Sequence, residues 1–129
     1  MADRTLISSG SYLEPIIGFS RAVRVGNFVS IGGTAPIAVG GGTAAKGDVY
    51  GQAKRIFEII GKALADAGAS FEHVTRTRIL LTDITLWEQA VKAHAEVFAT
   101  IRPVTTTMAV AGFVDPDWLI EIEVDAIIP

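Results

Sequence analysis

Two stretches of this chain place apolar residues at three- and four-residue steps, which is the spacing of one helical face. The first lies between Asp48, a candidate N-cap, and Gly68, a natural stop. Its apolar positions are Ala53, Ile56, Ile60, Ala63, Leu64 and Ala67. The second follows a capping box in which Thr85 is the N-cap and Glu88 its partner, and Pro103 ends it and forces Arg102 out of the α region. Its apolar face comprises Trp87, Ala90, Val91, His94, Val97, Phe98 and Ile101.

Runs of aliphatic and β-branched residues predict strands in the rest of the chain. Residues 22–25 and 28–32 flank Gly26-Asn27, a pair that tolerates positive φ and is typical of a tight hairpin. Residues 74–81, 105–111 and 119–125 are rich in β-formers, and Asp115-Pro116-Asp117 predicts a turn before the last run. The order βββαβαββ predicts an α+β fold, in which both helices pack on one face of a mixed sheet.

Two adjacent glycines, Gly32 and Gly33, weaken the strand that they end. Glycine at such a place indicates either a β-bulge or the close approach of a ligand or of another backbone segment. The sequence leaves both possibilities open.

The side of the sheet without helices is predicted to carry charge. The last strand alternates strictly as Ile120-Glu121-Ile122-Glu123-Val124-Asp125, so three carboxylates share one face. The same alternation gives residues 74–81 a face made of Val74, Arg76, Arg78 and Leu80. This charged face has two interpretations, because it can be exposed to solvent or covered by other subunits that pair its charges.

The composition favours the subunit interpretation. The chain has 129 residues, of which 50% are hydrophobic and 19% charged, and its mean hydropathy is +0.42. An average soluble domain has about 25% charged residues. We expect a single domain over residues 1–129 that leaves apolar surface exposed and therefore associates with copies of itself.

The sequence also argues against several classes of protein. No apolar stretch approaches the roughly 20 residues of a membrane-spanning helix, and the N-terminus lacks the features of a signal peptide. The absence of cysteine excludes disulfides, thiolate metal sites and cysteine nucleophiles, and fits a cytoplasmic protein. A net charge of −3 without a basic stripe disfavours nucleic acid as a partner. The loop Gly40-Gly41-Gly42 lacks the Gly-Lys-Ser/Thr ending of a phosphate-binding P-loop.

Five segments together resemble the Rid family of reactive-intermediate and imine deaminases, also labelled L-PSP endoribonuclease-like. They are residues 25–33, 65–71, 77–83, 102–103 and 120–123, which are spread along most of the chain in the family's order. The resemblance implies a chorismate-mutase-like fold and a homotrimer with small-molecule clefts between its subunits.

The site residues of the deaminase branch are mostly replaced in this sequence. That branch has a Pro-x-Arg-Ser run whose arginine holds the carboxylate of a 2-imino acid, and Thr105 occupies the arginine position here. The family's cysteine, tyrosine, serine and asparagine correspond to Thr107, Phe19, Gly32 and Val91. Glu121 keeps the family's glutamate, which is taken to position the attacking water. The chain is thus predicted to be an arginine-less branch, because threonine offers one neutral hydrogen bond and no charge.

Glu121 is the candidate catalytic residue, as a general base or as the group that orients water. The alternative is a structural carboxylate paired with an arginine across a subunit boundary. Thr105 and Thr107 point to the same side of their strand. Together with the backbone at Gly32 and Gly33, they are candidates for substrate binding. Their alternative is an ordinary role as strand-forming residues.

Arg78 and Arg102 are candidates to replace the missing cation. The alternatives are that Arg78 pairs with Glu121 or Glu123, and that Arg102 bonds a carbonyl at the end of its helix. A cation supplied by a neighbouring subunit is a further possibility.

Phe19 and Trp118 are candidates for the aromatic wall of a cleft, with plain burial as the alternative. His94 is expected to be a core or interface side chain, and His73 lies in a predicted loop. Two distant histidines without cysteine predict no metal site, and no cofactor is implied.

Three functional hypotheses follow. The first is hydrolysis of a small imine, enamine or amide-like metabolite at a cleft between subunits, with Glu121 orienting water. The second is a non-catalytic trimer that binds a small ligand or regulates a partner. The third is an endoribonuclease, which the negative net charge disfavours because phosphate contacts dominate the affinity for RNA.

Overall fold

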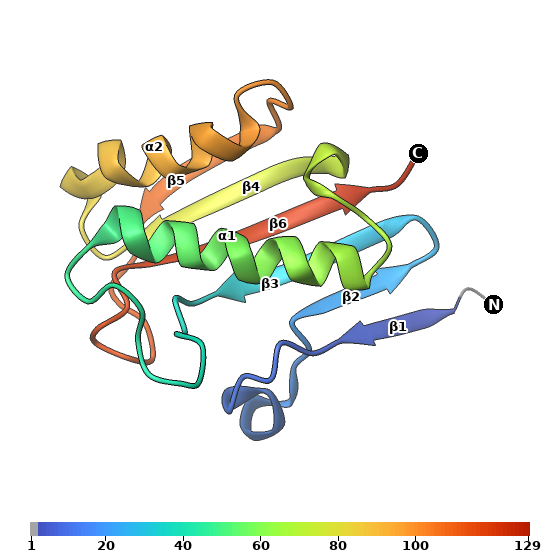
Figure 1. The fold of residues 1–129 in the computed structure, drawn as a ribbon, viewed down its shortest axis with the longest axis horizontal. Coiled ribbons are helices and arrows are strands. Elements are labelled where there is room, and N and C mark those ends of the chain that lie inside the picture. Colours follow the sequence, from blue (N-terminus) through green and yellow to red (C-terminus); the bar gives the residue numbers. More distant parts are fainter. Residues whose placement is uncertain (1–2) are drawn as a thin grey trace.

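The computed structural model describes residues 3–129, which form a single six-stranded sheet with the order β1-β2-β3-β6-β4-β5 (Figure 1). The strands are β1 (Arg4–Ile7), β2 (Ala22–Val25), β3 (Phe28–Thr34), β4 (Val74–Leu81), β5 (Val104–Ala109) and β6 (Ile120–Ile127). In this sheet β4 and β5 are parallel, and the other neighbouring pairs are antiparallel. The predicted order of elements and the mixed sheet are therefore confirmed.

Two helices, α1 (Val49–Asp66) and α2 (Trp87–Phe98), cover the same face of the sheet (Figure 1). Asp48 caps α1 as predicted, because its side chain accepts a hydrogen bond from the Gly51 amide at 3.1 Å. Gly68 follows the end of α1 with a φ of +83°, a conformation that favours glycine. The predicted α+β class and the one-sided helix layer are confirmed.

The predicted capping box of the second helix is wrong. α2 begins at Trp87, and Leu86 is its N-cap without a side-chain bond. Asp83 instead accepts hydrogen bonds from the amide of Thr85 at 2.9 Å and from its hydroxyl at 2.7 Å. The Thr85 hydroxyl is therefore already engaged, and the chain makes a short 3-10 turn, Ile84–Leu86, before the helix starts.

A β-bulge corrects the predicted face of β4. Val74 pairs with Ala126, whereas Arg76 pairs with Asp125, so Thr75 is the extra residue. The bulge turns Val74 to the helix side, where it is only 4% exposed. Val74 thus belongs to the core and not to the charged face that Arg76 shares.

The charged face of β6 is formed as predicted. The aliphatic residues Ile120, Ile122 and Val124 are buried under the helices, and the carboxylates alternate with them on the other side. Arg78 lies 4.0 Å from Glu123 and 3.9 Å from Asp125, and Arg76 lies 3.8 Å from Asp125. Two of the three acids on this strand are therefore paired within the chain.

A buried glutamine fixes the start of β6. The side chain of Gln52 on α1 donates to the carbonyl of Asp117 at 2.9 Å and accepts from the amide of Leu119 at 2.9 Å. Both bonds are shielded from water, because Gln52 is fully buried. This contact ties α1 to the residues that lead into β6 and thereby positions Glu121.

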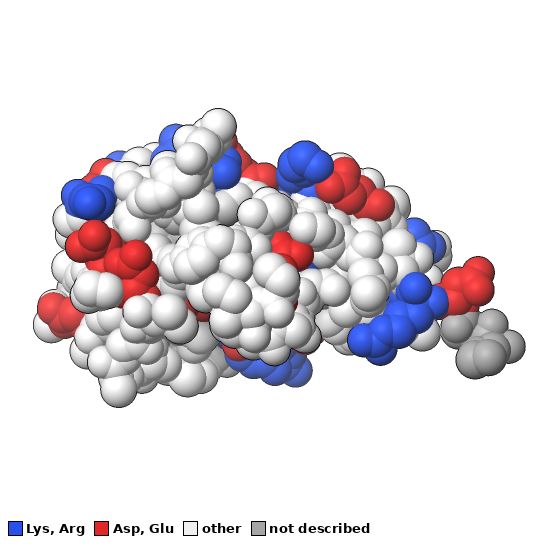
Figure 2. Space-filling model, turned by 90° about the horizontal axis from the view of Figure 1, so that it is seen from below, with Lys and Arg blue, Asp and Glu red and all other residues white. Residues whose placement is uncertain are grey.

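The distribution of surface charge and the length of the helices relate to two partners that the sequence disfavoured, nucleic acid and a membrane. Figure 2 shows one face of the molecule, on which lysines and arginines lie in separate groups between acids and broad uncharged areas. Within residues 3–129, none of the helices is long and apolar enough to cross a membrane.

Candidate functional site

Glu121 lies beside an irregularity of β3. The pairing of β3 with β6 shifts register between Ile31 and Thr34, the stretch that contains Gly32 and Gly33. A Cβ placed on Gly33 would lie 2.6 Å from Oε1 of Glu121. The irregularity that the glycine pair predicted is confirmed, and the group that approaches Gly33 closely is the side chain of Glu121, not a backbone segment.

A cavity of about 260 Å³ opens at the Glu121 carboxylate. The structure brings four residues named by the sequence to this cavity: Glu121, Gly33, Phe19 and Trp118. The remaining lining residues are Ser11, Leu13, Ile17, Arg21, Ala35, Ile37 and Val114. We call this the Glu121 cavity.

The sequence reasoning missed Arg21, which is only 4% exposed. Its Nη1 donates to the carbonyl of Gly33 at 2.7 Å and to the hydroxyl of Thr34 at 3.2 Å, and its guanidinium lies 5.1 Å from the ring centroid of Phe19. Arg21 directly precedes β2, and the groups that accept from its Nη1, Gly33 and Thr34, belong to the neighbouring strand β3. The pattern of residues 22–25 gives no sign of these contacts.

Burial controls the charge of the site. It raises the pKa of Glu121 above its ordinary value, with the attraction of Arg21 opposing that effect and the repulsion of Glu123 adding to it. Burial also lowers the pKa of Arg21, and the negative charges of Glu14 and Glu121 oppose this decrease. Within residues 3–129, the Glu121 side chain forms no hydrogen bond or ion pair, so its oxygens are free to accept from a ligand.

Trp118 adds an unused donor to the same wall. Its indole Nε1 is buried and has no hydrogen-bond partner among the described residues. A buried donor without a partner costs free energy, of the order of 1–3 kcal/mol.

Thr105 and Thr107 do not reach the Glu121 cavity. Thr105 pairs with Thr77 across the parallel strands, and their hydroxyls lie 2.8 Å apart. The Thr77 hydroxyl also lies 2.8 Å from Nε2 of His94 on α2. Thr107 pairs with Ile79, a core residue, so both threonines point to the helix side of the sheet while Glu121 points to the other. Within one chain, this separates them from the catalytic candidate.

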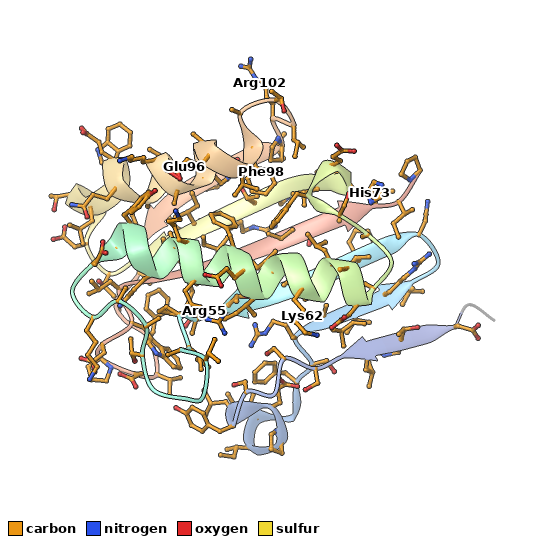
Figure 3. All side chains as sticks on the ribbon, in the orientation of Figure 1. Arg55, Lys62, His73, Glu96, Phe98 and Arg102 are labelled. Atoms are coloured by element: carbon orange, nitrogen blue, oxygen red, sulfur yellow. The ribbon has the colours of Figure 1, made fainter. Side chains whose placement is uncertain are left out.

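The two arginines proposed from the sequence also lie outside this cavity. Arg78 is paired with Glu123 and Asp125. Arg102 follows α2 with a φ of +60°, outside the right-handed helical region as predicted, and Figure 3 shows its side chain pointing away from the sheet. Of the described arginines, only Arg21 lines the Glu121 cavity.

The histidines have structural partners. His94 bonds to Thr77 and packs against Phe98, with 4.6 Å between the ring centroids. Nδ1 of His73 accepts from the Ser70 amide at 3.1 Å. No group of three acidic, histidine or cysteine side chains within residues 3–129 is arranged to hold a metal ion.

Comparison with known proteins identifies relatives along almost the whole chain. The 3-aminoacrylate deaminase RutC of Acinetobacter baylyi is 32% identical over 108 residues, which cover 84% of this chain and 85% of that protein. An uncharacterised protein of Streptomyces coelicolor is 38% identical over 120 residues, which cover 93% of this chain and 89% of the relative.

Solved structures agree with this relationship. A member of the YjgF/YER057c/UK114 family from Mycobacterium tuberculosis superimposes with a TM-score of 0.88 at 40% identity, covering 98% of this chain and 100% of that one. A Rid-family protein of unknown function from Yersinia pestis gives a TM-score of 0.87 at 25% identity, with 98% and 100% covered. The family model for endoribonuclease L-PSP matches residues 9–128. The chain therefore belongs to the Rid/L-PSP endoribonuclease family, and its sheet with two helices on one face is the predicted chorismate-mutase-like fold.

Proposed function

We propose that this protein is a hydrolytic deaminase that converts a small imine or enamine into a carbonyl compound and ammonia. The observation that carries the proposal is the Glu121 carboxylate, which lies in a cavity of about 260 Å³ without a hydrogen-bond or ion-pair partner among the described residues. The deaminase relative from Acinetobacter baylyi supports the same class of reaction.

Glu121 supplies the acid–base chemistry of this reaction. In the first step, the water oxygen bonds to the C=N carbon while Glu121 accepts a proton from water, and the nitrogen receives that proton. In the second step, the C–N bond breaks as the hydroxyl proton passes through Glu121 to the leaving nitrogen. The products are a carbonyl compound and ammonia, and Glu121 returns to its ionised form. An enamine enters the same route after it tautomerises to the imine.

The surroundings of Glu121 suit this task. The raised pKa makes its carboxylate a stronger base than an exposed glutamate. Phe19 and Trp118 provide apolar walls for the body of a substrate, and the volume of the cavity limits that substrate to a small molecule. Thr105 at the family's arginine position removes the usual grip on a carboxylate, so the substrate is expected to differ from a simple 2-imino acid.

The proposal includes a second copy of the chain, as part of a homotrimer that completes the cleft. β5 is an edge strand of the sheet, so its outer hydrogen-bonding edge is open to a neighbour. Met108 lies on the same side of the sheet as Glu121, because both are in register with Leu80. Sedimentation or light scattering would report the trimer, and a monomer at working concentration would contradict this part of the proposal.

The decisive experiment measures ammonia release from small imines and enamines generated in the assay. Wild-type protein is expected to accelerate release, and Glu121→Gln to lose about 10²-fold or more, the usual contribution of a general acid–base group. Glu123→Gln is the matched control, since this acid is two residues further along the same face and is paired with Arg78. Rates of wild-type and Glu121→Gln protein that both equal the buffer rate would contradict a deaminase.

A non-catalytic ligand-binding trimer is the second candidate, and the location of Thr105 and Thr107 favours it. Neither threonine joins Glu121 within one chain, so the hydroxyl groups that the sequence proposed for polarising a reacting atom are absent from the described lining of the cavity. Thermal-shift measurements with keto acids, amino acids and nucleobases test this function. A large stabilisation without turnover would support binding alone.

A further inference from the structure

A second cavity, of about 450 Å³, lies next to the Glu121 cavity and shares Ser11, Arg21, Ala35 and Ile37 with it. The segment around Ser9, the end of β3, the glycine-rich loop at Gly40 and the face of α1 that carries Arg55 enclose it. Figure 3 shows Arg55 on the same side of α1 as Lys62. Arg55 and the glycine-rich loop do not line the Glu121 cavity, so we treat this as a separate space, the Arg21–Arg55 cavity.

Two guanidinium groups line this cavity, and no carboxylate is among its described lining residues. Arg21 is more than nine-tenths buried. Its Nε donates to the Ser9 hydroxyl, and its Nη1 to Gly33 and Thr34. No hydrogen bond between described residues uses its Nη2. Arg21 is a mostly buried cation with free donors on Nη2, so it favours an acceptor oxygen, and a ligand in either adjoining cavity can supply one.

Arg55 is held at the wall by one bond and keeps other donors for a ligand. Its Nε donates to the carbonyl of Ile37 at 2.7 Å. Its Nη1 lies 3.5 Å from Oε2 of Glu58, whose side chain is 68% exposed. Such an exposed ion pair is weak, so it competes poorly with an anion that binds inside the cavity.

The rest of the wall defines what kind of anion fits. Ile37, Val39 and Ile59 give it an apolar side, and Tyr12 adds a hydroxyl group. The Ser9 hydroxyl is already engaged, because it accepts from Arg21 and donates to Glu14. Glu14 lies near Arg21, but its carboxylate accepts from the amides of Ser9 and Ser11 at 3.1 and 3.0 Å. Glu14 and Glu58 together offset part of the positive charge of Arg21 and Arg55. One negative charge attached to a short hydrocarbon body is therefore a better match than a dianion such as phosphate.

We propose that the Arg21–Arg55 cavity binds a small aliphatic monocarboxylate. Its carboxylate accepts from Nη2 of Arg21 and from the guanidinium of Arg55, and its hydrocarbon body contacts Ile37 and Ile59. The site adjoins the Glu121 cavity and differs from it by Arg55, Ile59 and the glycine-rich loop. The proposal stands whether or not the protein is a deaminase.

Titration calorimetry with 3-methylbutanoate tests the proposal, with the neutral 3-methylbutanamide and inorganic phosphate as comparison probes. Wild-type protein is expected to bind the carboxylate, and to bind the amide and phosphate at least about ten-fold more weakly, since a hydrogen bond to a charged group contributes on that scale. The amide resonances of Gly40 and Gly41 should shift during the titration. Binding of the amide or of phosphate as tightly as the carboxylate would overturn the assignment.

Three variants test whether the carboxylate binds in the Arg21–Arg55 cavity. Arg55→Gln should weaken carboxylate binding at least about ten-fold, whereas Arg102→Gln, at an arginine outside both cavities, should leave it unchanged. Val39→Asp places a negative charge at a position that is 85% exposed, so it tests the same site without disturbing the core and should also weaken binding. Unchanged affinity in Arg55→Gln and Val39→Asp, or an equal loss in Arg102→Gln, would contradict the proposal.

Discussion

The carboxylate of Glu121 occupies the space that a side chain at residue 33 would need. A Cβ on Gly33 would lie 2.6 Å from Oε1 of Glu121, closer than non-bonded atoms approach one another. The glycine on β3 and the acid on β6 are therefore interdependent. Glu121 reaches the cavity only because its neighbour has no side chain.

Replacement of Gly33 by alanine should displace the Glu121 carboxylate and damage function. The added Cβ meets only the far end of a flexible side chain, which can rotate away, so we expect little change in the free energy of unfolding. Urea denaturation measures stability, and ammonia release measures activity. Gly32→Ala is the control, because a Cβ there meets nothing within 4 Å. Equal behaviour of the two variants would show that the contact between Gly33 and Glu121 is unimportant.

Replacement of Glu121 by glutamine should make the protein more stable at neutral pH while removing its proposed chemistry. Burial raises the pKa of Glu121 in the folded protein above its value in the unfolded chain. Ionised Glu121 therefore lowers the free energy of unfolding at pH values above the raised pKa, and it has no such effect below the pKa of the unfolded chain. The stability advantage of Glu121→Gln should thus grow as the pH rises from 4 through the raised pKa. Melting temperatures across this range measure it. A variant that is less stable than wild type at pH 7 would contradict the reasoning.

The fold was largely predictable because its signals are local. The alternation of residues 120–125 and the helical spacing before Gly68 each identify one element and its buried face. The errors arose where a neighbouring residue changed the local geometry. Asp83 engages the hydroxyl of Thr85, and the bulge at Thr75 reverses Val74; a periodic pattern records neither effect.

The candidate site was only partly predictable, because it is made by contacts between distant residues. Phe19, Gly33, Trp118 and Glu121 were named from the sequence and meet at one cavity. Arg21 was not named, since its role depends on the carbonyl of Gly33 in the adjacent strand. The side of the sheet on which β5 presents its threonines depends on its pairing with β4, which the sequence does not give.

Replacement of Arg21 by glutamine should destabilise the protein and change the ionisation of Glu121. The loss of its bonds to Gly33 and Thr34 is expected to cost about 1.5–3 kcal/mol, the contribution of hydrogen bonds from a charged group. The pKa of Glu121 should rise further, because the attraction of Arg21 opposes the effect of burial. NMR titration of the side-chain carboxyl carbon measures this pKa. Arg102→Gln should change neither quantity, and an unchanged Glu121 pKa in Arg21→Gln would refute the coupling.

His94 should make the protein less stable in mild acid. Burial lowers its pKa in the folded state, so the unfolded chain binds a proton more readily. The stability that neutral His94 contributes is complete above about pH 6.5, its pKa in the unfolded chain. That stability is lost as the pH falls through the lower pKa of His94 in the folded protein. His94→Gln should therefore flatten the decline in melting temperature below pH 6.5. The same decline in wild type and variant would exclude His94 as its source. His73→Gln serves as a control for the loss of a histidine elsewhere.

The pH dependence of the proposed deamination should report the same carboxylate. Glu121 must be ionised to accept a proton from water, so kcat/KM is expected to fall tenfold per pH unit below its pKa. Because burial raises that pKa, the acid limb should lie at a higher pH than the ordinary glutamate value of 4.5. Steady-state rates from pH 4 to 8 with a substrate that does not titrate in this range would show the limb. Arg21→Gln removes the attraction that opposes the effect of burial and should move the limb to higher pH, while a limb below the ordinary glutamate value would contradict the assignment to Glu121.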